Sequence, residues 1–187
     1  MFDSLDRKIN EHNAAVNEIL KNDDLKSKIY SVAEVVTSAI KNNNKILLFG
    51  NGGSAADCQH IAAEFVGRFK KERRGYPAIA LTVDTSILTS VSNDYSFENV
   101  FSRQIEAIGQ KGDMAIGIST SGKSKNVLEG LNQAKKNGLA TVLFCGRQYD
   151  SECADLIIPV PADSAETIQE CHMIIGHFIA GYAEENL

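Results

Sequence analysis

Apolar side chains recur at helical spacing along the first part of the chain. Residues 3–43 hold two such runs, which predict two helices separated by Asn22 and the two aspartates after it, a segment that also supplies a helix cap. Residues 45–49 then form a short apolar run closed by a glycine-rich loop, which predicts a buried strand. Ser54 is expected to cap a helix that reaches about residue 70. Together these segments predict a β-loop-α unit.

The same unit repeats toward the C-terminus. Strands are expected at residues 78–82, 113–118, 141–144 and 156–160. A mostly helical stretch is expected at residues 85–108, and helices at residues 124–137 and from Ser164 onward. This alternation predicts a parallel sheet of about five strands covered on both faces. Because crossovers between parallel strands are right-handed, the expected fold class is α/β, a doubly wound three-layer αβα sandwich with two N-terminal helices in a single domain of residues 1–187. The charged residues 70–75 are expected to be a solvated connection.

The composition narrows the class of protein. The chain has 187 residues, 43% hydrophobic and 23% charged, which suits one globular domain and excludes two catalytic domains. Its four cysteines show no CxxC or framework spacing, so we expect a reducing, cytoplasmic compartment. A net charge of −5 opposes general affinity for nucleic acid, and no run approaches the roughly 18 apolar residues that span a membrane. Neither nucleic acid nor a membrane is therefore expected as a partner, whereas binding of a small anionic ligand at a local site is compatible with this charge.

The first glycine motif lies between a predicted strand and a predicted helix. Residues 50–55 satisfy the GxGxxA pattern of dinucleotide-binding folds. Such a site also needs an acidic residue about 20 positions further on to hold the ribose. The nearest suitable candidate, Asp84, follows Gly50 by 34 residues. The spacing therefore disfavours a dinucleotide site.

The second glycine motif, residues 117–124, fits the P-loop pattern GxxxxGK[ST] letter for letter. Its interior is rich in hydroxyls rather than glycines, and the later strands do not end in an aspartate placed to hold Mg²⁺. What remains is a phosphate cradle of backbone N–H groups at a helix N-terminus. The hydroxyls that would complete it belong to Ser119, Thr120, Ser121 and Ser124. The competing interpretation is ordinary turn and capping chemistry.

Two helices carry a candidate metal-binding or acid–base set. His60 and Glu64 are four residues apart and share one helix face, which suits two metal ligands or a simple hydrogen bond. Gln169 and His177 are separated by a rise of about 12 Å on the last helix, so both reach one ion only if it lies between them. His172, three residues after Gln169, is a nearer competitor.

Several ordered motifs lie in residues 50–54, 58–69, 75–81, 92–95, 117–122 and 168–170. Together they resemble, over nearly the whole chain, the phosphoheptose (sedoheptulose 7-phosphate) isomerases of the sugar isomerase, or SIS, fold. The resemblance implies an aldose–ketose isomerase that makes D-glycero-D-manno-heptose 7-phosphate through an enediol, the first step towards nucleotide-activated heptose for lipopolysaccharide or capsule. It also implies a homotetramer with active sites between subunits, served by residues 1–43, and one zinc ion per subunit.

The resemblance also implies roles for individual residues. The sugar would be lined by Asn51, Gly52, Gly53, Asn93, Asp94 and Gln169, the phosphate held by Ser119, Thr120, Ser121 and Ser124, and zinc bound by His60, Glu64, Gln169 and His177. Glu64 is our hypothesis for the catalytic base and His177 for the acid. A lone pair committed to zinc is a poorer base, so these two residues cannot freely serve both roles.

The chain departs from the family pattern at two positions. Lys123 stands where many relatives carry Asn and adds a cation near the expected phosphate, whereas Thr167 stands where many carry Arg and leaves one basic contact in doubt. Arg68 is expected either to orient Glu64 or to form a surface ion pair. A non-catalytic SIS protein, either a sugar-phosphate sensor or an adaptor that binds the replication initiator, is the alternative function. The retained ligand set favours the enzyme.

Overall fold

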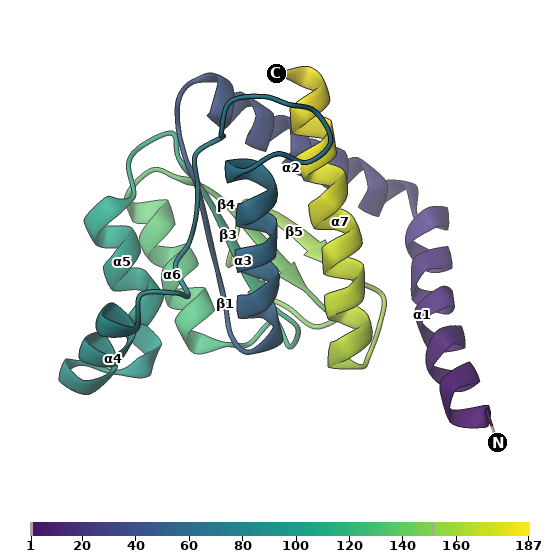
Figure 1. The fold of residues 1–187 in the computed structure, drawn as a ribbon. Coiled ribbons are helices and arrows are strands. Elements are labelled where there is room, and N and C mark those ends of the chain that lie inside the picture. The colour runs from purple at the N-terminus through teal and green to yellow at the C-terminus, as the bar shows by residue number, and fades with distance from the viewer. Residues whose placement is uncertain (1, 151) are drawn as a thin grey trace.

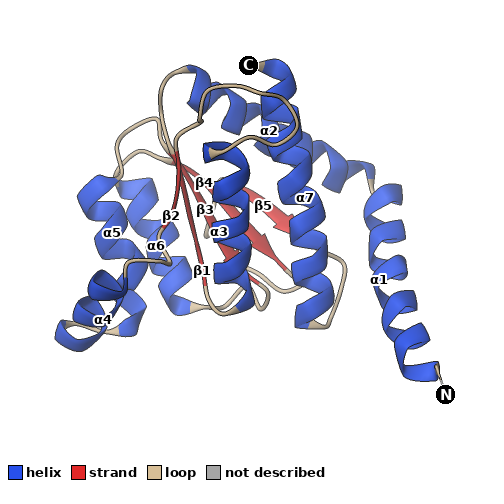
Figure 2. Ribbon diagram, in the orientation of Figure 1, coloured by secondary structure: helices blue, strands red, loops and turns tan. Residues whose placement is uncertain are grey.

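A computed structural model describes residues 2–150 and 152–187. Its centre is a five-stranded sheet in the order β2-β1-β3-β4-β5, and every neighbouring pair is parallel (Figure 2). The strands are β1 (Ile46–Gly50), β2 (Ala78–Ala80), β3 (Met114–Ser119), β4 (Ala140–Cys145) and β5 (Leu156–Pro159). The predicted parallel sheet is confirmed.

Helices cover both faces of this sheet (Figure 1). They are α1 (Asp3–Lys21), α2 (Asp23–Lys41), α3 (Gly53–Val66), α4 (Thr85–Asp94), α5 (Val100–Ile108), α6 (Lys125–Lys136) and α7 (Ala165–Asn186), with a short 3-10 helix, η1 (Phe97–Asn99). One apolar core lies between the sheet and helices α2, α3 and α7, and a second between the sheet and helices α5 and α6. The doubly wound αβα sandwich is therefore confirmed.

The burial of the strands explains why they read as apolar runs in the sequence. Every residue of β1 and of β3 is buried, because helices pack on both faces of the central strands. The edge strand β2 has only three residues, and its central Ile79 is 41% exposed. Within the two described ranges, no helix is long and apolar enough to cross a membrane.

Two local predictions, both on helix α3, were wrong. Helix α3 begins at Gly53 rather than after Ser54, because Gly52 is the N-cap and has a φ of +55°, which favours glycine. The same helix ends at Val66, well short of residue 70. The mostly helical stretch expected at residues 85–108 is confirmed, and it consists of α4, which ends at Asp94, then η1 and α5.

The topology brings distant segments to one edge of the sheet. Strands β1 and β3 are neighbours, with Gly50 paired to Ile118, so the loops that follow these two strands lie at the same carboxyl edge. Helices α3 and α7 contact each other on one face of the sheet (Figure 1). Ligands of open parallel sheets bind beyond the carboxyl ends of the strands, where the strand order reverses. The loops after β1 and β3 therefore lie where such folds bind their ligands.

Candidate active site

Small residues let helices α3 and α7 approach closely. A Cβ atom on Gly53 would lie 2.5 Å from the side-chain Nε2 of Gln169, and one on Gly176 would lie 2.7 Å from Cδ1 of Ile61. Both contacts advance in the same direction along the two helices, so the helices run parallel. His60 and His177 are the sequence neighbours of Ile61 and Gly176, so they lie at the level of this second contact.

His60, Glu64 and His177 form one close group. Nε2 of His60 lies 3.0 Å from Nε2 of His177 and 3.2 Å from Oε1 of Glu64, and one donor atom of each residue lies within 4.8 Å of the others. The side chains of His60 and Glu64 are 51% and 24% exposed, so a substrate can reach them. Two imidazoles and a carboxylate are the ligands of many catalytic zinc sites, which keep a further position open. The group therefore fits a zinc ion.

Gln169 lies at a different level of the two helices. Its carboxamide packs against Gly53 at the N-terminal end of α3, whereas His60 is about two turns further along that helix. The fourth expected ligand thus borders both the glycine loop and the helix pair that carries the other three.

The competitor His172 is engaged elsewhere. Its ring is fully buried, and its Nε2 lies 3.3 Å from the carbonyl oxygen of Cys145 at the end of β4. Burial lowers the pKa of His172 to about 4, with the contact to the Cys145 carbonyl acting in the opposite direction. His172 is therefore a neutral core residue.

One further acid lies beside the close group. Burial raises the pKa of Asp57 to about 6, and the nearby His60 partly offsets this. Within the described part of the chain, the Oδ2 atom of Asp57 is buried without a hydrogen-bond partner. Sequence reasoning missed this residue, although its position one helical turn before His60 is a signal that could have found it.

The expected phosphate cradle is assembled around the turn between β3 and α6. The hydroxyl of Ser119 donates to the hydroxyl of Ser124 over 2.8 Å and lies 3.4 Å from that of Ser121. Gly122 has a φ of +66°, and a Cβ atom there would collide with the backbone of Gln148. Thr120 lines a cavity of about 300 Å³ beside this turn. Hydroxyls and helix N–H groups therefore converge where an anion can bind.

Two cations line the same cavity. Lys123 Nζ donates to the side-chain oxygen of Gln148 over 2.8 Å, and Arg147 pairs with Glu18 and lies 3.6 Å from Asp163. The Nζ of Lys123 is therefore paired with Gln148, whereas the lysine of a P-loop binds phosphate.

A reciprocal amide pair joins the two loops at the sheet edge. Asn51 and Asn126 each donate one side-chain N–H to the other's oxygen, both over 2.8 Å. Asn126 is buried at the start of α6, and the pair spans 75 residues of sequence. Sequence reasoning missed Asn126, because nothing in the local pattern indicates so distant a partner.

The remaining predicted residues lie apart from the close group. Asn93 and Asp94 end helix α4 and are exposed, and Asn93 donates to its neighbour over 2.9 Å. Asp84, weighed above as a ribose ligand, caps the start of α4 by accepting from the N–H of Ile87. Of the two expected roles, Arg68 takes the surface ion pair, with Glu72 at 3.9 Å.

The charged connection between α3 and β2 differs from expectation. Arg73 is only 9% exposed and forms an ion pair with Glu184, whose side chain is 2% exposed. The expected solvated connection is therefore wrong at Arg73. One sequence signal was available, namely a glutamate within the apolar face of the last helix.

Comparisons with known proteins define the class and then the particular family. A family model described as the SIS domain matches residues 10–146. The chain is 47% identical to the phosphoheptose isomerase of Nitratiruptor sp. over all of both chains, and 54% identical to that of Aquifex aeolicus over 84% of each. The solved phosphoheptose isomerase of Neisseria gonorrhoeae is 35% identical, with a TM-score of 0.90 over 98% of both chains. The chain belongs to the SIS domain family and, within it, to the phosphoheptose isomerases.

Proposed function

We propose that the close group formed by His60, Glu64 and His177 is the active centre of a phosphoheptose isomerase, which converts D-sedoheptulose 7-phosphate to D-glycero-D-manno-heptose 7-phosphate. The observation that carries this proposal is the convergence of three donor atoms within 4.8 Å from two helices. The prediction of an aldose–ketose isomerase is confirmed by the relatives. The alternative of a non-catalytic sensor or adaptor has no support from them.

The reaction moves a carbonyl group from C2 to C1. A proton must leave C1 to give an enediol, a proton must return at C2, and the proton on the C1 oxygen must pass to the C2 oxygen. We assign the proton at carbon to Glu64 and the proton exchange between the oxygens to His177. Oε1 of Glu64 is the oxygen that faces His60, so Oε2 is assigned to proton transfer. This division separates the ligand and base roles of one carboxylate.

Zinc would be held by His60, Glu64 and His177, whose donor atoms converge, with Gln169 beside Gly53 as the expected fourth ligand. When bound, the ion would polarise the carbonyl and stabilise the enediolate. The chain's own residues orient the substrate. Ser119, Thr120, Ser121 and Ser124 hold the phosphate, and Asn51, Gly52, Gly53, Asn93, Asp94 and Gln169 line the sugar. Binding energy from the remote phosphate then positions C1 and C2 for proton transfer.

We infer that residues 1–187 form one SIS domain and that residues 1–43 serve its assembly into a homotetramer in the cytoplasm. Helix α1 lies at one side of the fold (Figure 1), where it contacts α7, and it still exposes Leu5, Ile9 and Leu20. Such an apolar face favours contact with another subunit. Light scattering on the purified chain should give a tetramer mass. A monomer of full activity would contradict the inference.

The experiment that tests the function is turnover of D-sedoheptulose 7-phosphate followed by NMR. The purified chain should produce a new heptose anomeric signal, which disappears after chelation and returns with added zinc. A protein carrying Glu64→Gln should produce none. If the unmodified chain instead binds ATP with Mg²⁺ and leaves the sugar phosphate unchanged, the isomerase proposal fails and the P-loop interpretation returns.

A further inference from the structure

The loop at residues 67–75 is held by one buried carboxylate. Oε2 of Glu184 accepts from the backbone N–H groups of Lys70 and Lys71, over 2.8 and 2.9 Å. Oε1 accepts from the N–H of Phe69 and from Nε of Arg73, both over 3.0 Å. The carboxylate of Glu184 is nearly fully buried and accepts four charge-assisted hydrogen bonds, so it fixes the loop in a way that a solvated connection does not require.

Arg73 carries the same network to the end of helix α3. Its Nη2 donates to the carbonyl oxygen of Glu64 over 2.8 Å, and its Nη1 donates to that of Phe65 over 2.9 Å and of Gly67 over 3.2 Å. These carbonyls are among those that a helix C-terminus leaves without partners. Arg73 therefore caps the helix at the residue whose carboxylate belongs to the close group.

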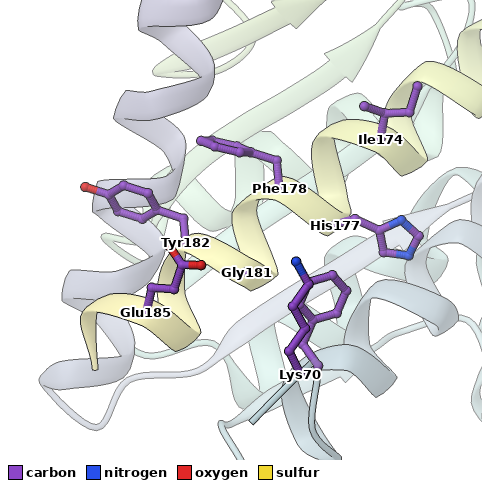
Figure 3. Close-up of a pocket in the computed structure, with 8 residues that line it drawn as sticks. Lys70, Ile174, His177, Phe178, Gly181, Tyr182 and Glu185 are labelled. Carbon is purple, nitrogen blue, oxygen red and sulfur yellow. The ribbon is translucent and has the colours of Figure 1, made fainter.

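Phe69 connects this loop to His177. The two rings are stacked, with centroids 5.7 Å apart and planes inclined by 24°. A Cβ atom on Gly181, one turn beyond His177 on α7, would lie 3.2 Å from Phe69 Cε1, so the glycine makes room for the ring. Lys70 and His177 face a common cavity of about 330 Å³ (Figure 3). One side of the imidazole is thus covered by a side chain that Glu184 keeps in place.

We propose that Glu184 and Arg73 are positioning residues for the isomerase reaction, because they fix loop 67–75 so that Phe69 stacks on His177 while the end of α3 holds Glu64. This inference rests on the proposed function for its catalytic consequence. Its structural part, that Glu184 orders the loop and thereby the ring of His177, stands on the contacts alone. Small displacements of a catalytic group lower the rate strongly, since proton transfer depends on geometry.

Limited digestion with trypsin tests the structural part, because the loop contains Lys70, Lys71, Arg73 and Arg74. In Glu184→Gln and in Arg73→Lys, cleavage within the loop should be at least about 10-fold faster than in the unmodified protein, because opening then costs fewer hydrogen bonds. Glu106→Gln removes an exposed carboxylate that pairs with Arg103 and serves as the matched control. Unchanged cleavage in both loop variants overturns the proposal.

Kinetics and NMR test the positioning role. Glu184→Gln and Phe69→Leu should each lower kcat by about 10-fold with little change in KM, and the double variant should be no slower than the slower single variant. Phe69→Leu should keep its resistance to trypsin. In histidine-labelled protein, both single variants should shift the imidazole signal of His177, which reports the stacking directly. Additive losses, or a normal kcat in Phe69→Leu, would overturn the positioning role.

The outcomes separate this inference from the proposed function. If the unmodified chain does not isomerise the sugar phosphate, the function fails, while trypsin and the His177 signal still decide whether Glu184 orders the ring. If Glu184→Gln does not fold, Arg73→Lys and Phe69→Leu carry the same test. If the imidazole signal of His177 is unshifted in both Arg73→Lys and Glu184→Gln, the inference is wrong, independently of the activity that the variants show.

Discussion

The side-chain amides of Asn51 and Asn126 bond to each other in both directions, each over 2.8 Å. The pair joins the glycine loop after β1 to the first turn of α6, where the hydroxyl cradle ends. The part of the site proposed for the sugar and the part proposed for the phosphate are therefore fixed relative to each other by two hydrogen bonds.

Replacing Asn126 tests this connection. In Asn126→Ala the amide of Asn51 loses both bonds in a half-buried position, so we expect a loss of about 1–3 kcal/mol in the free energy of unfolding. KM for the sugar phosphate should rise more than kcat falls, because the spacing between the sugar part and the phosphate part of the site is no longer fixed when the substrate binds. Denaturant unfolding and steady-state kinetics measure the two effects. Asn132→Ala, on the same helix, is the comparison, and equal behaviour of the two variants would contradict the assigned role.

Adjacent glycines allow a matched test of the Gln169 position. A Cβ atom at Gly53 would lie 2.5 to 2.8 Å from the carboxamide of Gln169 and must displace it, whereas nothing lies within 4 Å of the same position at Gly52. Gly53→Ala should therefore lower zinc content and kcat with little loss of stability. Gly52→Ala should lower stability by about 1–3 kcal/mol through strain at its φ of +55°. Metal analysis and thermal unfolding distinguish them, and full zinc occupancy in Gly53→Ala would remove Gln169 from the ligand set.

Much of the fold could be predicted because strands that are buried on both faces appear in the sequence as continuous apolar runs. The apolar run at residues 45–49 predicted strand β1, which is buried at every position. Periodicity placed helices α2 and α6 to within about two residues. The break between α4 and α5 was missed, since Ser96 begins η1 with a side-chain cap inside an otherwise helical pattern. Helix propensity alone does not show whether a serine at this position caps a new helix or lies within a continuous one.

The candidate site likewise contains residues that the sequence could indicate and residues that it could not. His60 and Glu64 could be paired from sequence because both lie on one helix, one turn apart. The pairs Arg73–Glu184 and Asn51–Asn126 span 111 and 75 residues, and each depends on tertiary packing that no local period encodes. Sequence reasoning therefore named His60 and Glu64 as candidates and missed Asn126 and Glu184, whose contacts depend on the tertiary fold.

The buried His172 predicts a dependence of stability on pH. Its pKa is about 4 in the folded chain and near 6.5 when exposed, so between these values only the unfolded chain binds the proton. Stability should therefore fall as the pH drops from 6.5 to 4. His172 should account for about 3 kcal/mol of this loss in the free energy of unfolding. Urea unfolding of the unmodified protein and of His172→Gln gives the difference, in which the carboxylates common to both cancel. Parallel pH profiles would exclude this role.

Removing the proposed base should lower turnover strongly without unfolding the protein. Glu64 is partly exposed and belongs to neither apolar core, so Glu64→Gln should keep its melting temperature and oligomeric state. Its kcat should fall by about 10²–10⁴-fold, the usual contribution of positioned acid–base catalysis. Chelation should inactivate the unmodified protein, and added zinc should restore it, whereas zinc should not rescue Glu64→Gln. Glu129→Gln, an exposed carboxylate on α6, should behave as the unmodified protein. A Glu64→Gln protein that turns over sedoheptulose 7-phosphate at a near-normal rate would assign the proton transfer to another group.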